Sequence, residues 1–438
     1  MRAVAEISDP IHGYFYLSSV EKDIVDSPLF QRLRRIRQLA SAYLTYPSAQ
    51  HTRFEHSLGA MHLAGYAGNV LKDKEYVSSD DVQMLRLAAL LHDIGHGPFS
   101  HLFEEVLEVK SNITHEDIGR MIIRKSAISD ILAKHGYRAD EISDLAFGQS
   151  SRMFLNEIIS GGLSVDLMDY LQRDAYFTGA HYGRIDAERI ISSLEVYDGR
   201  LAIDRAALNS FESLLIARYQ MFKAVYFHKT VRAAEVMLLK AMMLADGHLH
   251  LSESYKRVED YMRLTDDMTL ANLLMLKVDV NNNNDKDDSN IKELRLAKRL
   301  AEDYRDRRLF KSVFESILQA SSRLINRLTD ARYLKDRCDE IAGIAGVDPD
   351  MVYIDSAKAP SIPRAPGKEE PRDLILVGKE PFRVKRIELK DIPLISSILG
   401  YMNMIRVYTI EEHREKVAKA ALSVFGSEAE SWYERIAV

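Results

Sequence analysis

The chain is nearly free of cysteine, with a single residue, Cys338, among 438. One thiol cannot form an intramolecular disulfide or a thiolate cage for a metal ion. This scarcity fits a reducing environment, so we expect a cytoplasmic protein. The opening residues, MRAVAEISDP, contain an acidic residue and a proline where a secretory signal needs an apolar core. No stretch reaches the ~18 apolar residues of a membrane span, so we expect no membrane partner.

The chain has no excess of basic charge either. Its 59 Lys and Arg residues are outnumbered by 65 Asp and Glu residues, which gives a net charge of −6. Overall composition therefore does not indicate a nucleic-acid partner, although that partner stays open. An anionic substrate must meet local clusters of basic residues. The sequence also has no GxxxxGK[ST] motif, which excludes a Walker-type nucleotide hydrolase.

Helical periodicity is what the chain does have. Hydrophobic residues make up 46% of the sequence, which is ordinary for a globular protein, and the length allows two or three domains. From about residue 20 to 250, apolar residues recur at every third or fourth position, as in VQMLRLAALLHDI. We predict a mainly α-helical fold here, preceded by a small hairpin with strands near 3–7 and 14–17.

Three consecutive domains are predicted: 1–250, a helical extension at 251–345, and a small C-terminal α/β domain at 346–438. The extension contains the Asn-rich polar run 278–290, which we expect to be a loop. The helical pattern resumes over 291–318. Four prolines between residues 356 and 372 predict an extended connector. Short β-prone runs and a helix near Glu411 follow, the runs lying at 374–377, 382–389 and 405–410.

An adjacent His92-Asp93 pair is the clearest chemical signal. It follows the apolar run LAALL, which predicts a buried helix, and burying both groups costs several kcal/mol unless they are paired or bind a metal. His96 comes one helical turn later, a Gly-Pro pair then breaks the helix, and His101 follows. A core histidine with a capping aspartate is the alternative for an isolated His-Asp pair. The full run HDIGHGPFSH makes that alternative much less favourable.

Two further residues complete a candidate metal site. His56 lies in RFEHS, ahead of another helical run, and Asp166 shares one helical face with Asp169, Tyr170 and Asp174. Taken alone, His56 is uninformative and a surface histidine explains it, while a solvated acidic face is the favoured explanation of the aspartates. Together with His92 and Asp93 they indicate a divalent metal used for hydrolysis. The ligand types do not identify the ion, and Fe, Mn, Zn, Ni, Co and Mg all stay open.

Several motifs together resemble a known family. DPIHG, SPLFQRLRRIRQLA, YPSAQHTRFEHSLGA, LLHDIGHGPFSH, a His-Glu pair and DLMDYLQRD occur in the order seen in the HD-domain dNTP triphosphohydrolases. That family includes the human SAM- and HD-domain enzyme and bacterial and archaeal relatives. The similarity spans roughly residues 7–250 and weakens through about 345. It implies an HD-domain helical bundle that hydrolyses a dNTP to the deoxynucleoside and inorganic triphosphate.

The resemblance also implies roles for individual residues. Four would bind the metal: His56, His92, Asp93 and Asp166. Four would line the scissile phosphate as acid–base or charge-stabilising groups: His96, His101, His115 and Glu116. Five would bind the substrate, with Arg53 on a phosphate, two residues packing against the deoxyribose and base, and two holding the sugar: Gln38 and Leu39, then Tyr170 and Asp174.

A regulatory site and an oligomer are further implications of the resemblance. Asp26, Gln31 and Arg34 stand where activated family members read a guanine edge, so activation by GTP or dGTP is a hypothesis. An ordinary surface ion pair is the alternative for these three residues. The resemblance also implies a homotetramer or a homodimer.

Two other functions stay open. One is an HD phosphohydrolase that acts on another nucleotide phosphate ester, such as a monophosphate or a cyclic nucleotide. The other is a non-catalytic, nucleotide-sensing oligomer that keeps the fold. The presence of every expected ligand and acid–base residue argues against the second.

Overall fold

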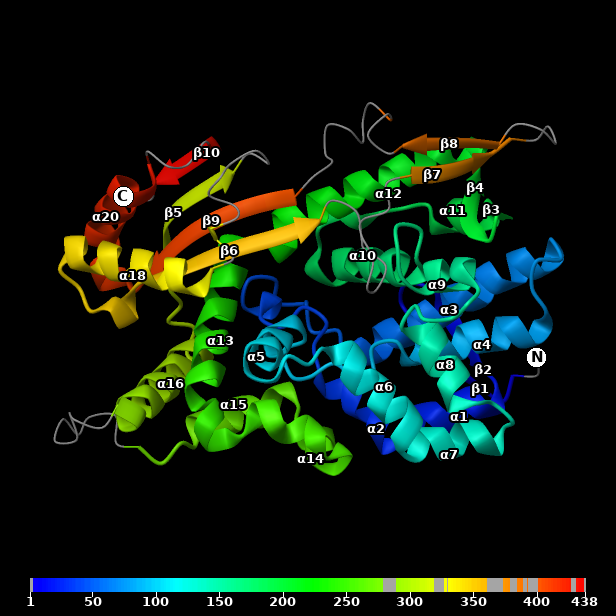
Figure 1. Ribbon diagram of the computed structural model, residues 1–438, viewed down its shortest axis with the longest axis horizontal. Coiled ribbons are helices and arrows are strands. Elements are labelled where there is room, and N and C mark those ends of the chain that lie inside the picture. The colour runs from blue at the N-terminus through cyan, green and yellow to red at the C-terminus, as the bar shows by residue number, and fades with distance from the viewer. Residues whose placement is uncertain are drawn as a thin grey trace. The chain divides into compact units, whose positions relative to one another are not determined.

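The computed structural model describes most of the chain (Figure 1). The described residues are 3–278, 289–318, 327–328, 330–360, 373–378, 384–388, 392, 401–426 and 431–436. Most of the Asn-rich run at 278–290, and residues 361–372 of the expected connector, lie outside them. No helix within the described residues is long and apolar enough to cross a membrane.

Contacts divide the chain into two compact units. The first comprises Met1–Met221, His250–Thr269 and Ile362–Leu399. The second comprises Phe222–Leu249, Leu270–Ser361 and Gly400–Val438. Each unit combines separate stretches of chain, whereas the three expected domains are consecutive. The expected domain boundaries, near residues 250 and 345, stay a prediction.

The first unit opens with the predicted hairpin. Strands β1 (Ala5–Asp9) and β2 (Gly13–Leu17) pair antiparallel. The turn between them closes because Asp9 Oδ1 accepts hydrogen bonds from the backbone N–H groups of Ile11 and His12, at 3.0 and 2.9 Å. The DPIHG sequence therefore forms an aspartate-stabilised turn.

Three helices lie at the centre of the first unit: α3 (Arg53–Asp73), α4 (Ser79–Leu91) and α10 (Val165–Thr178). Each begins after a Ser or Thr, a residue type that satisfies free N–H groups at a helix start. Helix α3 packs against both of the others (Figure 1). It is buried on almost every side because small residues line it: Gly59, Ala60, Ala64, Gly65, Ala67 and Gly68.

Further helices complete this unit, in keeping with the predicted helical bundle. They are α1 (Ser19–Val25), α2 (Pro28–Gln31), α5 (His101–Ser111), α6 (His115–Lys125), α7 (Ala127–Lys134), α8 (Ala139–Ala146), α9 (Met153–Ile159), α11 (Ala187–Ser192), α12 (Leu208–Met221) and α14 (Val258–Arg263). Helix α15 (Asp266–Leu274) begins in the first unit and ends in the second.

A four-stranded sheet completes the first unit, in the order β3-β4-β7-β8. Its strands are β3 (Leu194–Tyr197), β4 (Arg200–Asp204), β7 (Asp373–Val377) and β8 (Val384–Glu388). The last two were expected from their β-prone runs, and the first two were not. An Asp198-Gly199 pair joins β3 to β4, and both residues have positive φ, at 51° and 71°. That pair is a hairpin signal, which the surrounding helical pattern concealed.

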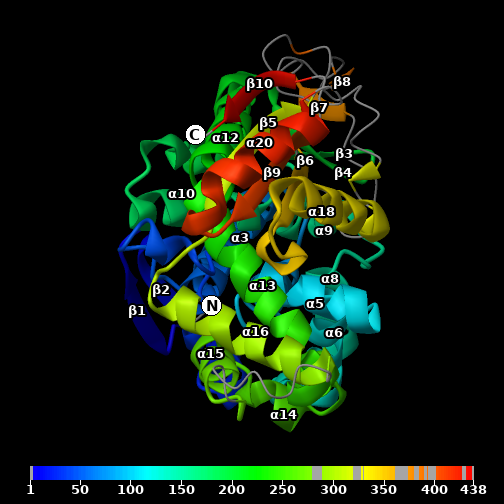
Figure 2. The same ribbon diagram turned by 90° about the vertical axis from the view of Figure 1, so that its left-hand side faces the viewer.

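The second unit combines helices with an antiparallel sheet in the order β10-β5-β9-β6. Helices α18 and α20 pack side by side and contact the sheet (Figure 2). Phe314, Ile405 and Phe425 belong to the core between them. The elements are α13 (Lys229–Leu249), α16 (Ser289–Arg305), α18 (Ala331–Ala345), α20 (Arg414–Phe425), β5 (Lys311–Leu318), β6 (Tyr353–Pro360), β9 (Tyr401–Thr409) and β10 (Ser431–Ile436).

Two expectations for this unit were wrong. The helical pattern was expected to continue to residue 318, but helix α16 ends at Arg305 and Lys311–Leu318 forms strand β5. Pairing with strands on both sides overrides the local helical pattern there. The start of the expected connector is strand β6, which runs to Pro360. A proline is tolerated because β6 lies at the edge of its sheet.

Candidate active site

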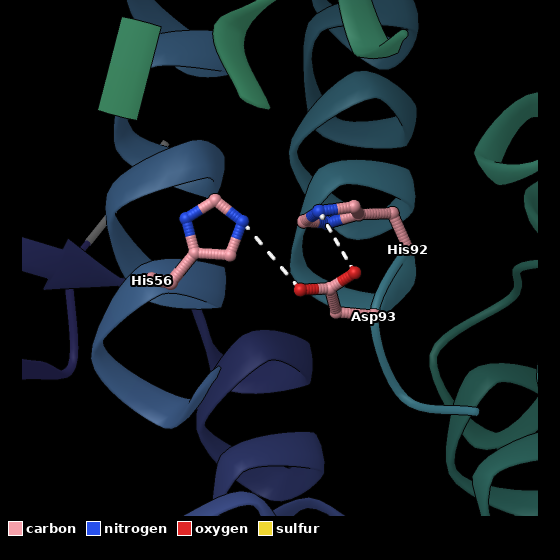
Figure 3. Close-up of side chains that lie close together, drawn as sticks. All are labelled: His56, His92 and Asp93. Atoms are coloured by element: carbon pink, nitrogen blue, oxygen red, sulfur yellow. Dashed lines mark ion pairs between the residues drawn. The ribbon is translucent and has the colours of Figure 1, made fainter. Parts of the chain in front are cut away.

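Three of the four predicted metal ligands meet between α3 and the end of α4 (Figure 3). His56 lies in the first turns of α3, and His92 and Asp93 directly follow α4. His56 Nε2 is 3.5 Å from Asp93 Oδ2, and His92 Nε2 is 3.4 Å from Asp93 Oδ1. One ligand atom from each residue lies within 4.8 Å of the others. The side chains are 1%, 11% and 7% exposed, so this donor group is almost closed to solvent.

The fourth predicted ligand, Asp166, lies at the solvent side of this group. It is the second residue of α10, and its side chain is 34% exposed. Its Oδ1 atom lies 3.1 Å from His56 Nε2 and 3.7 Å from His92 Nε2. Asp166 therefore faces the same two imidazole nitrogens as Asp93, from the open side.

The hydrogen bonds of the two histidines suit a metal. His56 Nδ1 is 2.8 Å from Asp169 Oδ2, and His92 Nδ1 is 2.7 Å from the carbonyl oxygen of Ala89. When Nδ1–H donates to such a partner, the lone pair of Nε2 is left to bind a metal. Metal-binding histidines usually have this arrangement, with the second ring nitrogen donating to a carboxylate or a carbonyl oxygen. Both Nε2 atoms are buried, and neither has a hydrogen-bond partner among the described residues. Two orphaned nitrogens beside carboxylates fit a divalent cation.

The electrostatics of the group also favour positive charge. Burial lowers the pKa of His56, but Asp166 and Asp169 outweigh it and raise that pKa to about 10. The pKa of His92 is also raised, because Asp93 and Asp166 outweigh its burial. The carboxylates therefore favour protonation of the imidazoles unless a cation binds in place of the protons.

A buried network lies behind His56. Arg173 holds both oxygens of Asp169 through its Nε and Nη2 atoms, each at 2.9 Å, and His12 Nε2 is 2.7 Å from Asp169 Oδ1. Asp9 Oδ2 in turn lies 2.7 Å from Arg173 Nη1. The roles of these residues were not predicted. The signal was the pairing of Asp169 with Arg173 four positions later, on one helical face.

A second cluster contains three of the four residues expected to line the scissile phosphate. The rings of His96 and His115 stack with centroids 3.9 Å apart, and His101 lies 5.3 Å from His96. Glu104 contacts the Nδ1 atoms of His115 and His101 at 2.5 and 3.3 Å. His96 Nε2 lies 3.2 Å from Asp93 Oδ1, which links this cluster to the metal ligands. Glu104 was not predicted, although its place three residues after His101 was a signal.

The charges within this cluster are set by burial and by near neighbours. Burial and the adjacent Arg53 hold the pKa of His96 well below its usual range, so the ring is neutral at pH 7. Burial raises the pKa of Glu104, but His101 and His115 outweigh it and keep that pKa below its ordinary value. The cluster thus combines the neutral imidazole of His96 with the ionised carboxylate of Glu104, which orients the imidazole of His115.

Glu116 and Arg53 have other partners. Glu116 Oε2 lies 3.1 Å from Arg120 Nη2, so Glu104, and not Glu116, contacts the histidines. Arg53 Nη1 contacts Asp93 Oδ2 at 2.5 Å, and this guanidinium is buried. The expected roles of Glu116 in catalysis and of Arg53 in phosphate binding stay predictions.

Two of the predicted sugar and base residues contact His51. Asp174 Oδ1 is 2.8 Å from His51 Nε2, and the backbone N–H of Gln38 donates to the His51 carbonyl oxygen at 3.1 Å. Leu39 follows Gln38 and is half-buried. Burial raises the pKa of Tyr170 to about 12, so this phenol stays protonated. His51 was not among the predicted residues.

The three residues of the expected guanine site are only partly together. Arg34 Nε donates to Gln31 Oε1 at 2.9 Å, and the Arg34 guanidinium lies 3.5 Å from the centre of the Phe54 ring. Asp26 instead pairs with Lys22 at 2.5 Å. The ion-pair alternative therefore describes Asp26, and the activator site stays a prediction.

Comparison with known families agrees with this geometry. Residues 53–174 match the HD domain, and residues 185–433 match the HD associated region. The chain belongs to the HD-domain family. This confirms the resemblance and the mainly α-helical HD fold. The HD-domain match runs from Arg53 to Asp174 and so includes every proposed metal ligand.

The chain is similar in sequence to proteins of an archaeon and of a eukaryote. An uncharacterized protein of Methanocaldococcus jannaschii is 39% identical over 274 residues, which cover 62% of this chain and 55% of that protein. A Dictyostelium discoideum protein named deoxynucleoside triphosphate triphosphohydrolase SAMHD1 homolog is 30% identical over 330 residues, or 71% of this chain and 60% of that protein. The matched part spans a little over half of each of these two relatives.

Solved structures share the fold over nearly the whole chain. A hypothetical protein from Aquifex aeolicus has a TM-score of 0.74 at 29% identity, over 95% of this chain and 99% of that one. A phosphohydrolase from Bacteroides thetaiotaomicron has a TM-score of 0.71 at 26% identity, over 92% of this chain and 99% of that one.

Proposed function

We propose that this HD-domain protein is a metal-dependent phosphohydrolase that converts dNTPs to deoxynucleosides and inorganic triphosphate. One observation carries the proposal most: the orphaned Nε2 atoms of His56 and His92 face Asp93 beside a cluster of three histidines. The Dictyostelium relative, named a deoxynucleoside triphosphate triphosphohydrolase SAMHD1 homolog, supports the choice of substrate.

The ligand set is His56, His92 and Asp93, with Asp166 from the solvent side. A divalent cation bound there would supply an acidified water molecule and neutralise phosphate charge. Behind it, Asp169 and the Ala89 carbonyl fix the orientation of the two imidazoles. Nitrogen and oxygen donors of this kind accept several transition metals as well as magnesium.

The neighbouring histidines suit proton transfer. Hydrolysis adds the oxygen of water to the α-phosphorus and breaks its bond to the 5′ oxygen, which needs a proton as it leaves. The His115–Glu104 pair is the proposed proton donor, because the Glu104 carboxylate contacts Nδ1 and so orients the ring. Neutral His96, stacked on His115, can accept the proton that the attacking water loses.

Substrate recognition would use the side chains around His51. Tyr170 and Asp174 lie one and two turns beyond Asp166 on α10, which suits contact with a deoxyribose. The buried Gln38 Oε1 atom has no hydrogen-bond partner among the described residues, so it could accept from a sugar hydroxyl or a base. Arg53 would stabilise phosphate charge together with the cation.

Product analysis tests the proposal. The protein is incubated separately with four dNTPs and four NTPs plus Mn²⁺ or Mg²⁺, and the products are separated by chromatography. Inorganic triphosphate with a deoxynucleoside supports the proposal. Release of orthophosphate alone, or turnover only of monophosphates or cyclic nucleotides, indicates the rival phosphohydrolase. Metal binding without turnover of any nucleotide indicates the non-catalytic sensor.

Two variants check that the activity belongs to this site. His92→Ala/Asp93→Ala should lose bound metal and turnover together, since it removes two ligands. Asp267→Asn, whose side chain is 78% exposed, should retain both. A double variant that still hydrolyses dNTPs would place the chemistry elsewhere.

The activator and the oligomer are parts of the same proposal. GTP or dGTP would bind near Gln31 and Arg34 and favour an active homo-oligomer. Thermal-shift titration with each nucleotide, with size-exclusion chromatography in parallel, tests this. An Arg34→Ala variant that responds to both nucleotides as wild type does would rule out this site.

A further inference from the structure

The loop between the metal ligands and α5 has an unusual backbone. Residues 94–100 carry His96, and helix α5 begins directly after them with His101. Phe99 and Ser100 both have positive φ, 57° and 56°, although neither is glycine. Such conformations persist only where the surroundings hold them, and they concentrate at functional sites. The question is therefore which residues hold this loop.

A segment far along the chain supplies several of the contacts. Asp266, which begins α15, accepts a hydrogen bond from the backbone N–H of Phe99 at 2.7 Å through Oδ1. Its Oδ2 atom accepts from the backbone N–H of Arg37 at 3.0 Å. The hydroxyl of Tyr261, on α14, donates to the carbonyl oxygen of Gly95 at 2.7 Å. Both ends of the loop are thus tied to residues 261–266.

A buried arginine completes these contacts. Arg32 Nη2 donates to the carbonyl oxygen of His96 at 2.7 Å, and Arg32 Nε donates to that of Leu264 at 3.0 Å. Its guanidinium lies 4.5 Å from the centre of the Tyr261 ring. Arg32 therefore joins the middle of the loop to the same segment. Arg32, Tyr261 and Asp266 are each at most 5% exposed.

The chemistry of Asp266 is specific to a carboxylate. It faces two backbone N–H donors, and an ionised carboxylate offers an acceptor to each. Asparagine has one acceptor oxygen and would turn its NH₂ group toward the second donor. Burial also raises the pKa of Asp266 to about 6 despite both hydrogen bonds, so keeping it ionised is unfavourable.

We propose that Asp266, with Tyr261 and Arg32, is a positioning group for the catalytic loop. These residues fix the backbone conformation of residues 95–100. That conformation places His96 against His115 and sets the position at which helix α5, with His101 and Glu104, begins. They act through the loop and touch neither the metal ligands nor the proposed substrate residues. The inference rests on the proposed function, because it assigns to these residues the placement of that site's proton-transfer groups.

The test compares Asp266→Asn with Asp267→Asn. Asp267 is the adjacent residue, is 78% exposed and lies 3.7 Å from Arg37 Nη1, so it controls for loss of one negative charge at this point. We expect Asp266→Asn to lower kcat by up to about 100-fold, because misplacing a catalytic group by about 1 Å can cost that much. KM and bound metal should stay within about twofold of wild type. Asp267→Asn should leave all three unchanged.

A second readout does not depend on activity. Hydrogen exchange followed by mass spectrometry should show faster exchange of the peptide over residues 95–101 in Asp266→Asn, with α3 and α10 unchanged. Wild-type protein inactive on all nucleotides would refute the proposed function, while the exchange result would still test the positioning contacts. Equal exchange in Asp266→Asn and wild type would overturn the inference.

Tyr261→Phe covers the case in which Asp266→Asn does not fold. It removes only the hydroxyl that donates to Gly95, and it keeps the ring beside Arg32. We expect the same pattern at smaller size, with a lower kcat, unchanged KM and metal, and faster exchange over 95–101. Folded Tyr261→Phe with wild-type kcat and wild-type exchange would overturn the inference, as would a parallel loss of bound metal.

Discussion

Each nitrogen of the His56 ring faces a carboxylate. Nδ1 is held by Asp169, and Nε2 lies near Asp166 and Asp93. The carboxylate behind the ring fixes the tautomer and makes Nε2 a better ligand, which is the usual arrangement of a metal-binding histidine. In a sequence, a carboxylate that supports a metal-binding histidine looks like any other acidic residue. Asp169 could therefore be placed on the same helical face as Asp166, but its role could not be predicted.

Asp169→Asn should weaken metal binding. Removing the negative charge makes His56 Nε2 less basic, and loss of a partner of this kind typically lowers metal affinity by about 10- to 100-fold. Titration with Mn²⁺ by calorimetry measures the change, with Asp267→Asn as the exposed control. Wild-type affinity in a folded Asp169→Asn protein would show that the network behind His56 does not tune the site.

Asp266 should leave a pH signature in stability. Burial raises its pKa from 3.8 to about 6. The folded protein therefore binds this proton more tightly than the unfolded chain, and the resulting stability is fully present below about pH 4 and is lost as pH rises through about 6. The free energy of unfolding of wild type minus that of Asp266→Asn should fall by roughly 2 kcal/mol between pH 4.5 and 7.5. Urea unfolding with a chelator measures it, and a flat difference would contradict it.

At the scale of elements, α3 shows how close packing builds the site. A Cβ atom on Gly59 would lie 1.8 Å from Asp169 Oδ1 and 2.6 Å from Arg173 Nη2. Only glycine allows α10 to approach closely enough for Asp169 to reach His56. The helical periodicity of both elements was readable from the sequence, but their distance depends on one small residue.

Gly59→Ala should therefore destabilise the protein and disturb the site. Forcing a methyl group into this contact should lower the free energy of unfolding by about 1 to 3 kcal/mol or more and should also weaken metal binding. Gly247→Ala is the matched control, because Gly247 also lies in a helix, α13, and has no neighbouring atom within 4 Å of a Cβ. That variant should be neutral or stabilised by about 0.5 to 1 kcal/mol. Equal effects of the two substitutions would disprove the packing argument.

Elements that are set by residues close together in the chain could be predicted from the sequence, and elements that depend on distant residues could not. Hairpin β1–β2 and helices α3, α4 and α10 are set by turn residues, caps and periodicity close in the chain, and they were predicted. Strand β5 was predicted as helix, because its pairing with β9 and β10 involves residues about 90 or more positions away. The contact of Asp266 with Phe99 spans 167 positions and leaves no local pattern.

At the scale of the whole molecule, all proposed metal ligands belong to one compact unit. His56, His92, Asp93 and Asp166 lie within Met1–Met221. A cation that binds this arrangement and not the unfolded chain must stabilise the folded state of that unit. The second unit contributes no ligand to the group described, so its unfolding need not respond directly to the metal.

Removing the metal should lower thermal stability, and restoring it should raise stability in a saturable way. At free metal of about 100 times Kd, binding adds about 2.7 kcal/mol to the free energy of unfolding. Differential scanning calorimetry with chelator and then with increasing Mn²⁺ measures the shift in Tm. His92→Ala/Asp93→Ala should show no shift, and Asp267→Asn should shift as wild type does. A double variant that responds to Mn²⁺ like wild type would mean that stabilisation comes from another site, because these substitutions remove two of the three closest ligands.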